Sequence, residues 1–575
     1  MTTVARSPFP PPVRRFLREP FDAADVPALG RIVAELAARP LPDAAALAGW
    51  VADVDELESA LDAAEAHASI ATTCRTDDLA ARERHLDLQT RVLPAARKLL
   101  DGLHRVYLAC PHRAALDPRV HAMHDRAVVN RVALFRPENL PLAATISRLV
   151  ADFDERSGSL SVRFRGEAYT PQAMARFLDE PERDAREQAW LALARCRLGA
   201  ADELEALFEK LLEQRHQLAS NAGFPSFREY SFRERERFDY GIEECEAFHA
   251  SVEEHVVPAR SALHERRRAR LGVSTLRPWD LAVDAAGRPP LRVFRGGEEL
   301  ADLAGRLFER VDGELAGQFR FLREQRLLDL DNRPGKAPGG YQAFLEDRRL
   351  PFIFANSVGL VADLRTLLHE GGHAFHALAA RGQPLATGRH APLEFAEVAS
   401  MGMELLAAEH LPAVLGEEAG VRALRAQLER TLELLPWVAT IDAFQHWLYT
   451  YPEHTREERA AYWTALRRRF EPSVDWSGHE EWLSREWQRQ LHLFKHPFHD
   501  IEYGIAQVGA LQLWLNARHQ GRPAVTAWRE ALALGGSRPL PELFTTAHLC
   551  FDFGPRMLET LTAAVLDALA KLPDA

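Results

Sequence analysis

Cysteine is scarce in this sequence: 5 residues among 575, far apart and without a CxxC pair. Such a sparse, odd-numbered set argues against a disulfide framework and is typical of thiols in a reducing compartment. No stretch approaches the length of uninterrupted apolar sequence that a membrane-spanning helix needs. The N-terminal MTTVARSPFPPPVRRFL has prolines where a signal peptide needs an apolar run. We therefore expect a cytoplasmic protein that does not act in a membrane.

An excess of positive charge is also missing. Lys and Arg total 71 against 83 Asp and Glu, which gives a net charge of −12. Because nucleic acids and anionic membranes favour a basic surface, neither is the expected partner. Hydrophobic residues make up 47% and charged residues 27% of the chain, which is ordinary for a folded globular protein with a large core.

Helical periodicity dominates most of the sequence. Ala44–Ala68 and Asp78–Leu108 carry apolar residues at three- and four-residue spacing and predict long amphipathic helices. Polar and apolar residues alternate between Arg156 and Thr170, which predicts a β-hairpin. Two further short strands, YQAFL (341–345) and PFIFA (351–355), are predicted after a loop rich in Pro and Gly. The fold class is therefore mainly α with a small β-sheet.

We expect three parts along the chain: an irregular Pro-rich head at 1–20, an N-terminal helical domain at 21–185 and a large C-terminal domain at 186–575. The last of these contains DLRTLLHEGGHAFHAL (363–378), in which His369 and His373 lie four residues apart. On a helix both would reach one metal ion, and Glu370 could hold and deprotonate a metal-bound water. The alternative is a helix whose two histidines are simply hydrogen-bonded polar groups. Composition alone produces an HExxH motif roughly 0.1 times in a chain of this size.

A catalytic zinc ion needs a third protein ligand and leaves a position for water. The helix expected from about Ala391 offers Glu394, Glu397 and Glu404, of which the last two share a face. One could bind the metal while the other orients a ligating imidazole. Solvated surface carboxylates are the alternative, although the neighbouring residues are largely apolar.

Gly371 and Gly372 stand inside the predicted metal helix, where each costs about 1 kcal/mol relative to Ala. A helix that keeps both is expected to need a close approach of another segment at that turn. This departure from the local rule is typical of a functional site.

At these residues the sequence resembles the thimet oligopeptidase and oligoendopeptidase F family of zinc metallopeptidases, in particular its oligoendopeptidase F-like branch. The HExGHxxH pattern is matched from His369 to His376, and EFAEVAS is similar to the family segment that supplies the third ligand. The resemblance implies one zinc ion per chain, bound by His369, His373 and Glu397. It assigns Glu404 a position next to these ligands, without direct contact with the metal. It also implies a zincin-type bowl or clamshell fold with a deep central cleft, a zinc peptidase catalytic domain at 186–575, and hydrolysis of short oligopeptides with Glu370 as general base.

The family further has a C-terminal His and Tyr that stabilise the tetrahedral intermediate. Aligning HPFHDIEYG (496–504) assigns these roles to His492 and Tyr503, with His496 as the alternative histidine. His499 stands where many relatives carry another tyrosine, so substrate range or pH optimum is expected to differ. Tyr503 has a simpler interpretation as a core tyrosine, because its neighbours are apolar.

Two other functions compete with a general oligopeptidase. One is a peptidase dedicated to one peptide or leader substrate, and the other is a helical peptide-binding or scaffold protein without catalysis. A degenerate relative should have lost metal ligands or Glu370, and this chain keeps them. The strand at 351–355 shortly precedes the metal helix, and an exposed edge there would pair with an extended peptide substrate. The oligomeric state does not follow from the sequence.

Overall fold

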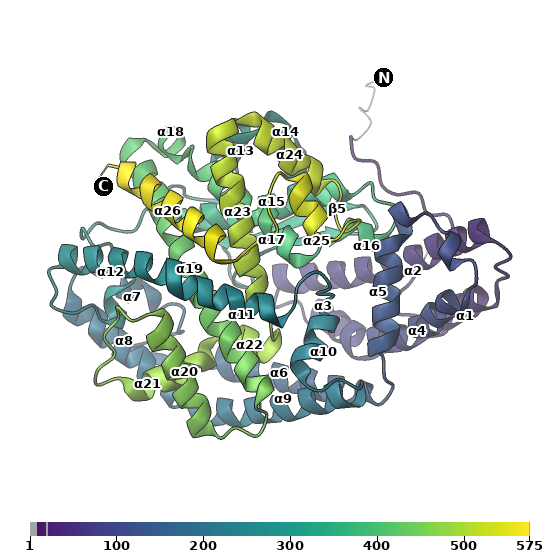
Figure 1. Ribbon diagram of the computed structural model, residues 1–575, viewed down its shortest axis with the longest axis horizontal. Coiled ribbons are helices and arrows are strands. Elements are labelled where there is room, and N and C mark those ends of the chain that lie inside the picture. The colour runs from purple at the N-terminus through teal and green to yellow at the C-terminus, as the bar shows by residue number, and fades with distance from the viewer. Residues whose placement is uncertain (1–7, 19–20, 574–575) are drawn as a thin grey trace. The chain divides into compact units, whose positions relative to one another are not determined.

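The computed structural model describes residues 8–18 and 21–573, in which helices predominate (Figure 1). Residues 8–18 contain no helix or strand, and the rest of the predicted irregular head, 1–7 and 19–20, lies outside the described residues. Among the described residues, none of the helices is both long enough and apolar enough to cross a membrane. The predicted mainly α fold class is confirmed.

The chain separates into two compact units, each assembled from three stretches of sequence. Unit 1 comprises Met1–Pro137, Arg292–Leu424 and Gly509–Phe551, whereas unit 2 comprises Glu138–Leu291, Arg425–Val508 and Asp552–Ala575. This interleaved division differs from the predicted linear one, with boundaries after residues 20 and 185, which stays a prediction.

Unit 1 contains a mixed sheet, and its N-terminal helices are drawn in purple to dark blue in Figure 1. Its elements are α1 (Val26–Ala38), α2 (Ala44–Cys74), α3 (Leu79–Asp87), α4 (Leu93–Ala109), α5 (Pro118–Leu134), α13 (Gly297–Val311), α14 (Gly313–Glu324), β3 (Leu328–Asp331), β4 (Gly340–Leu345), β5 (Leu350–Ser357), α15 (Val361–Ala380), α16 (Ala386–Arg389), α17 (Leu393–Ala408), α18 (Leu411–Leu415), α24 (Arg522–Leu532) and α25 (Leu540–Thr546).

The described residues of unit 2 form helices and one hairpin. Its elements are α6 (Asn139–Gly158), β1 (Val162–Phe164), β2 (Glu167–Tyr169), α7 (Ala175–Leu178), α8 (Arg183–Leu198), α9 (Ala201–Asn221), α10 (Phe227–Glu234), α11 (Ile242–Ser251), α12 (Val257–Leu271), α20 (Arg456–Phe470), α21 (Glu480–Arg485), α22 (Leu491–Lys495) and α26 (Pro555–Lys571). Two helices, α19 (Glu417–Thr450) and α23 (Asp500–Gln520), begin in one unit and end in the other.

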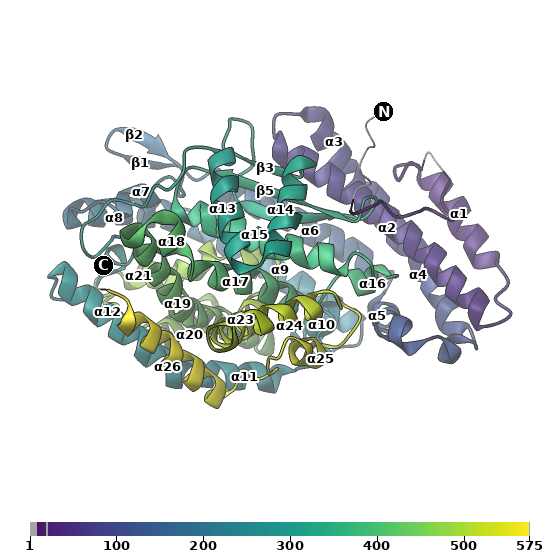
Figure 2. The ribbon, with the colours of Figure 1, turned by 90° about the horizontal axis from the view of Figure 1, so that it is seen from above.

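The long N-terminal helices form where the periodicity predicts them. Helix α2 begins after Asp43, whose carboxylate accepts a hydrogen bond from the Ala46 N–H at 2.8 Å, as an N-cap does. The predicted helix from Asp78 to Leu108 is present as α3 and α4, joined by one π-helical turn at Leu88–Val92. The predicted hairpin is also present as the antiparallel pair β1 and β2 (Figure 2).

The small sheet of unit 1 has the strand order β3-β5-β4. The predicted strands YQAFL and PFIFA are confirmed as β4 and β5, which pair antiparallel from Gly340 opposite Ala355 to Leu345 opposite Leu350. Strand β3 pairs parallel with the other side of β5, with Leu328 opposite Ile353. The predicted exposed edge on the 351–355 strand is therefore wrong, because β5 is the central strand. Its continuous apolar run is the composition expected of a strand that is covered on its faces. Strand β4, on the side of β5 away from β3, is an edge strand of this sheet.

Candidate metal centre

Helix α15 carries the HExGH motif and follows β5 directly. Its first turn is capped by Asp363, whose carboxylate accepts hydrogen bonds from the backbone N–H groups of Val358 and Leu360, each at 2.9 Å. Leu367 and Phe375 are fully buried and turn one side of the helix into the core. With the helix held in this rotation, His369 and His373 share a face, and their ring centroids lie 4.9 Å apart.

Helix α17 packs directly against α15 (Figures 1 and 2). The two glycines of the motif allow this approach. A Cβ at Gly372 would lie 2.4 Å from the backbone oxygen of Ala399 and 2.6 Å from the Cα of Ser400, both on α17. A Cβ at Gly371 would lie 2.7 Å from the ring of Phe308 on α13. The expected close approach at this turn is confirmed.

Three potential ligands converge where α15 and α17 touch. Glu397 Oε2 lies 3.3 Å from His369 Nε2 and 3.7 Å from His373 Nε2. One donor atom from each residue lies within 4.8 Å of the other two. Glu397 is buried, and the exposed fractions of the histidine side chains are 22% and 16%, so the group opens to solvent on the histidine side.

Each potential ligand has a second partner that orients it. Glu404 Oε1 lies 2.7 Å from His369 Nδ1, which leaves Nε2 of that ring directed toward Glu397. His373 donates to the backbone carbonyl of Ala396, and Ser400 Oγ donates to Glu397 Oε2 at 2.8 Å. Such outer partners are characteristic of metal ligands, because they determine the tautomer and the ring orientation. Glu397 and Glu404 are both buried, which excludes the alternative of solvated surface carboxylates.

Glu370 is buried beside this group without being part of it. It accepts a hydrogen bond from the backbone N–H of Gln342 in the middle of β4, so the edge strand lies next to its carboxylate. Burial raises the pKa of Glu370 to about 7, and the negative charges of Glu397 and Glu404 act in the same direction, against the opposing charge of His369. A carboxyl group that titrates near neutrality is suited to take up and return a proton.

The histidines differ in how readily they hold a proton. Burial opposes a charge on His369, yet its hydrogen bond to Glu404 and the surrounding carboxylates raise its pKa to about 9. Burial and the charge of His369 hold the pKa of His373 well below its ordinary value. The group of His369, His373 and Glu397 therefore favours one bound positive charge. Two imidazoles and a carboxylate are also a donor set of catalytic zinc sites, and nitrogen–oxygen separations of about 3.3 Å suit ligands at about 2.0–2.1 Å from one ion. The residues fit zinc.

A cavity of about 590 Å³ lies beside β4. Tyr341 and Phe344 of β4 line one side, and Asp62 and Glu65 of α2 line another. Tyr341 Oη lies 2.5 Å from Thr73 Oγ1 of α2, which holds the strand beside the helix. Burial raises the pKa of Asp62 to about 6, helped by neighbouring carboxylates. The cavity is acidic and adjoins the strand that contacts Glu370.

The predicted C-terminal residues form a second cluster, which belongs to unit 2. His492 and His499 have ring centroids 4.6 Å apart, and the ring of Tyr503 stacks 6.1 Å from that of His492. His492 Nδ1 lies 3.3 Å from Asp500 Oδ1. The alternative histidine, His496, lies at the edge of the cluster, 6.1 Å from His499 between centroids. The metal-ligand group belongs to unit 1, whereas this cluster belongs to unit 2.

His499 bonds to Tyr503 directly, which the sequence interpretation missed. Its Nε2 lies 3.0 Å from Tyr503 Oη, and its Nδ1 lies 2.8 Å from the buried carboxylate of Glu502. The same Nδ1 lies 3.4 Å from Nη1 of Arg235, so His499 is held by a carboxylate and a guanidinium while its Nε2 faces the Tyr503 hydroxyl. The available signal was the four-residue spacing between His499, which directly precedes α23, and Tyr503 on that helix. Tyr503 is half-buried and has a specific polar partner.

The model of peptidase family M3 matches residues 176–287 and 307–562, well over half of the chain. The chain belongs to peptidase family M3. The resemblance identified from the sequence is thereby confirmed, and both clusters described above fall inside the matched residues of this M3 chain.

Relatives and solved structures of the M3 chain agree with this assignment. An oligoendopeptidase F homolog of Lactococcus lactis subsp. lactis (strain IL1403) is 29% identical over 148 residues, 26% of this chain. The match spans about a quarter (24%) of that relative's length. A solved structure of PZ peptidase A with an inhibitor has a TM-score of 0.88 at 26% identity, over 98% of this chain and 99% of its own. One named as an oligoendopeptidase F has a TM-score of 0.88 at 27% identity, over 97% and 98%.

Proposed function

We propose that this M3 chain is a zinc-dependent endopeptidase that hydrolyses short oligopeptides. The observation that carries the proposal is the group formed by His369, His373 and Glu397 with the buried carboxylate of Glu370 beside it. Membership of peptidase family M3 supports peptide-bond hydrolysis as the reaction. One zinc ion per chain, oligopeptides as partners and a cytoplasmic location complete the proposal.

His369, His373 and Glu397 would hold the zinc ion. Glu404, at 2.7 Å from His369 Nδ1, keeps that ring in the tautomer that offers Nε2 to the metal. When bound, zinc would supply Lewis-acid polarisation of the scissile carbonyl and would acidify water in the site. A bound cation also replaces the proton that the metal-free group attracts, because its charge pairs with Glu397.

Glu370 is the proposed general base. Its ionised carboxylate accepts the proton of the attacking water, and the carboxylic acid that results returns this proton to the amine that leaves. The raised pKa of about 7 supports both steps, since neither form of the carboxyl group is strongly disfavoured near neutral pH. The hydrogen bond from Gln342 orients the carboxylate and also ties it to the strand where a substrate would lie.

Tyr503 and His492 are proposed to donate hydrogen bonds to the oxyanion that develops on the carbonyl. His499 would act through Tyr503. Its Nε2 is hydrogen-bonded to the Tyr503 hydroxyl at 3.0 Å, and its ring is itself held by Glu502. This arrangement fixes the side chain of Tyr503. A substrate oxygen must therefore compete with His499 for the Tyr503 hydroxyl.

The substrate is proposed to extend along β4, which is the edge strand next to Glu370. Backbone pairing with a strand edge gives affinity with little dependence on sequence, while pockets select side chains. The acidic cavity beside β4 provides one such pocket and favours a positively charged group. We expect loose specificity among short peptides, and digestion of a peptide library would instead reveal one strict sequence if the chain were dedicated to a single substrate.

Glu370→Gln tests the proposal most directly. The variant should retain one zinc per chain and peptide binding while its kcat falls by about 10²–10⁴, because the base is lost and the amide still fills the space. Glu324→Gln, the same change at an exposed position of α14, serves as the matched control and should leave kcat unaltered. Wild-type turnover by Glu370→Gln, or absence of hydrolysis by zinc-loaded wild-type protein across the library, would overturn the proposal.

A further inference from the structure

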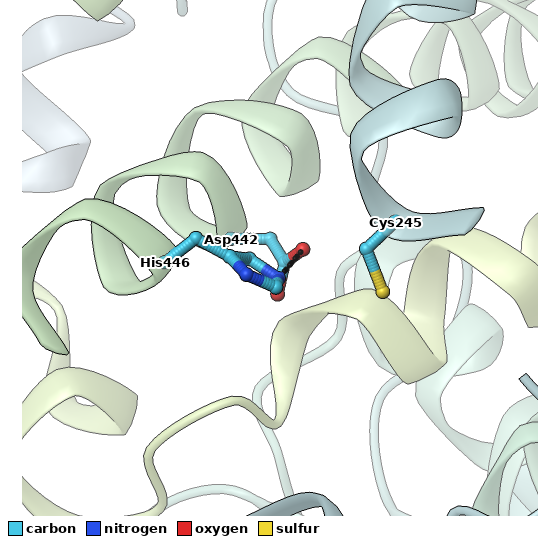
Figure 3. A group of neighbouring side chains, drawn as sticks. All are labelled: Cys245, Asp442 and His446. Atoms are coloured by element: carbon cyan, nitrogen blue, oxygen red, sulfur yellow. Dashed lines mark ion pairs between the residues drawn. The ribbon is translucent and has the colours of Figure 1, made fainter. Parts of the chain in front are cut away.

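Within unit 2, two helices each present a pair of metal-ligating residue types one turn apart. Cys245 and His249 lie four residues apart on α11, and Asp442 and His446 lie four residues apart on α19. This is the spacing that places His369 and His373 on one face of α15. In Figure 3 the carboxylate of Asp442 and the ring of His446 come from one helix and the thiol of Cys245 comes from the other. Donor atoms of these three residues all lie within 4.8 Å of one another.

The group lies in the core of unit 2. Cys245 and Asp442 have exposed fractions of 0%, and that of His446 is 5%. Asp442 Oδ2 has two imidazoles nearby, His249 Nε2 at 2.8 Å and His446 Nε2 at 3.3 Å. Its other oxygen, Oδ1, makes no hydrogen bond to any described residue, and neither does Nδ1 of His446, whose Nε2 forms the ion pair with Oδ2. Buried polar atoms of folded proteins are nearly always bonded, so atoms in this state indicate a missing partner.

We infer that Cys245, Asp442 and His446 bind a second metal ion, of the zinc class. A thiolate, an imidazole and a carboxylate together favour zinc over magnesium or calcium, which prefer oxygen ligands alone. The ion would occupy the lone pairs that Asp442 Oδ1 and one nitrogen of His446 leave unused. Binding would release the proton of the Cys245 thiol, since the ligand is the thiolate. His249 would hold Asp442 in place through its hydrogen bond at 2.8 Å, as outer partners of metal ligands do.

The ion would act structurally, because all three ligands are buried in the core of unit 2. It would connect α11 to α19 through ligands from both helices. The ring of His446 packs edge-on against Phe498, with centroids 5.4 Å apart. Phe498 has a φ of 61°, in the left-handed region, and it directly precedes His499. The ion would therefore brace the backbone that leads into the His492, His499 and Tyr503 cluster.

Cobalt substitution tests this inference independently of peptidase activity. Protein stripped of metal and reloaded with Co²⁺ should show the near-ultraviolet absorption of a cobalt–thiolate bond. The HExGH group contains no thiol, so this band reports on a cysteine ligand alone. Cys245→Ser should abolish the band and lower the bound metal by one ion per chain. Cys110→Ser, which removes another buried cysteine, should change neither.

Two further variants keep the result decisive. A chain in which Cys245 is the only cysteine, with Ser at positions 74, 110, 196 and 550, should retain the band even if Cys245→Ser does not fold. His369→Ala should lose the ion of the proposed catalytic site and keep the band, so that failure of one site is distinguishable from failure of the other. A folded wild-type protein without the band, or a band unchanged in Cys245→Ser, would refute the second site.

Discussion

Replacing Gly372 by Ala should damage the candidate metal centre more than its size suggests. The added Cβ would meet the backbone oxygen of Ala399 at 2.4 Å, whereas ordinary contact begins at 3.4 Å. Relief requires the two helices to separate by about 1 Å at this point, because backbone atoms cannot rotate away as a side chain does. Helix α17 carries Glu397 two residues before Ala399, so the proposed third ligand would move with it.

The magnitude follows from opposing effects. Overpacking costs about 1–3 kcal/mol, and the rigid neighbour favours the upper end. The better helix propensity of Ala returns about 1 kcal/mol, which leaves a net loss of about 2 kcal/mol in the free energy of unfolding. Metal sites tolerate displacements of only about 0.2 Å, so zinc affinity should fall by at least the roughly 10–100-fold seen when ligand orientation is disturbed.

Urea titration and zinc competition against a chelator measure both quantities. Gly317→Ala on α14 is the matched control, since nothing lies within 4 Å of its added Cβ, and it should stabilise the protein by about 1 kcal/mol with unchanged zinc affinity. Gly371→Ala should fall between the two, because the Phe308 ring that it meets at 2.7 Å can shift. If Gly372→Ala matched Gly317→Ala in stability and zinc affinity, close helix packing would not be what this glycine provides.

Three other outcomes follow from the geometry. Glu404→Ala removes the partner of His369 Nδ1 and should weaken zinc binding about 10–100-fold without removing a ligand, as competition titration would reveal; unaltered affinity would contradict the orienting role. The ionised form of Glu370 is the base, so kcat/KM should be level above the pKa of Glu370 and fall tenfold per pH unit below it. The midpoint should lie at or below pH 7, because a bound cation lowers that pKa; a kcat/KM that rises on acidification would refute this. Tyr503→Phe should lower kcat about 10²–10³-fold with little change in KM, whereas a packed core tyrosine would leave kcat unchanged.

The metal helix could be predicted from the sequence because its information is local. His369, Glu370 and His373 need only helical spacing to share a face, and the two adjacent glycines already indicated a close neighbour. The buried state of Glu397 followed from apolar residues around it on α17. In each case, residues within one helix carried the signal.

What could not be predicted depends on segments distant in sequence. The parallel strand β3 lies on the far side of β5 and is too short to be distinguished from a helix end, so β5 was mistaken for an edge strand. The contact of Glu370 with β4 required the sheet to be placed beside α15. Cys245 and Asp442 are each at a recognisable spacing from a histidine, but nothing local indicates that α11 and α19 meet. The interleaving of the two units is likewise a property of the tertiary contacts alone.

The order in which the chain is made gives that interleaving a consequence for biosynthesis. The last segment of unit 1 is Gly509–Phe551, and unit 2 is completed by Asp552–Ala575. A ribosome must therefore synthesise the chain as far as residue 551 before unit 1 has all its segments, and unit 2 is completed later still. Until then, the helices made early leave their apolar faces exposed. Long waits of this kind expose nascent chains to aggregation and to chaperone binding. We expect fragments that stop before residue 509 to be captured by chaperones, even though they contain every residue of the HExGH motif.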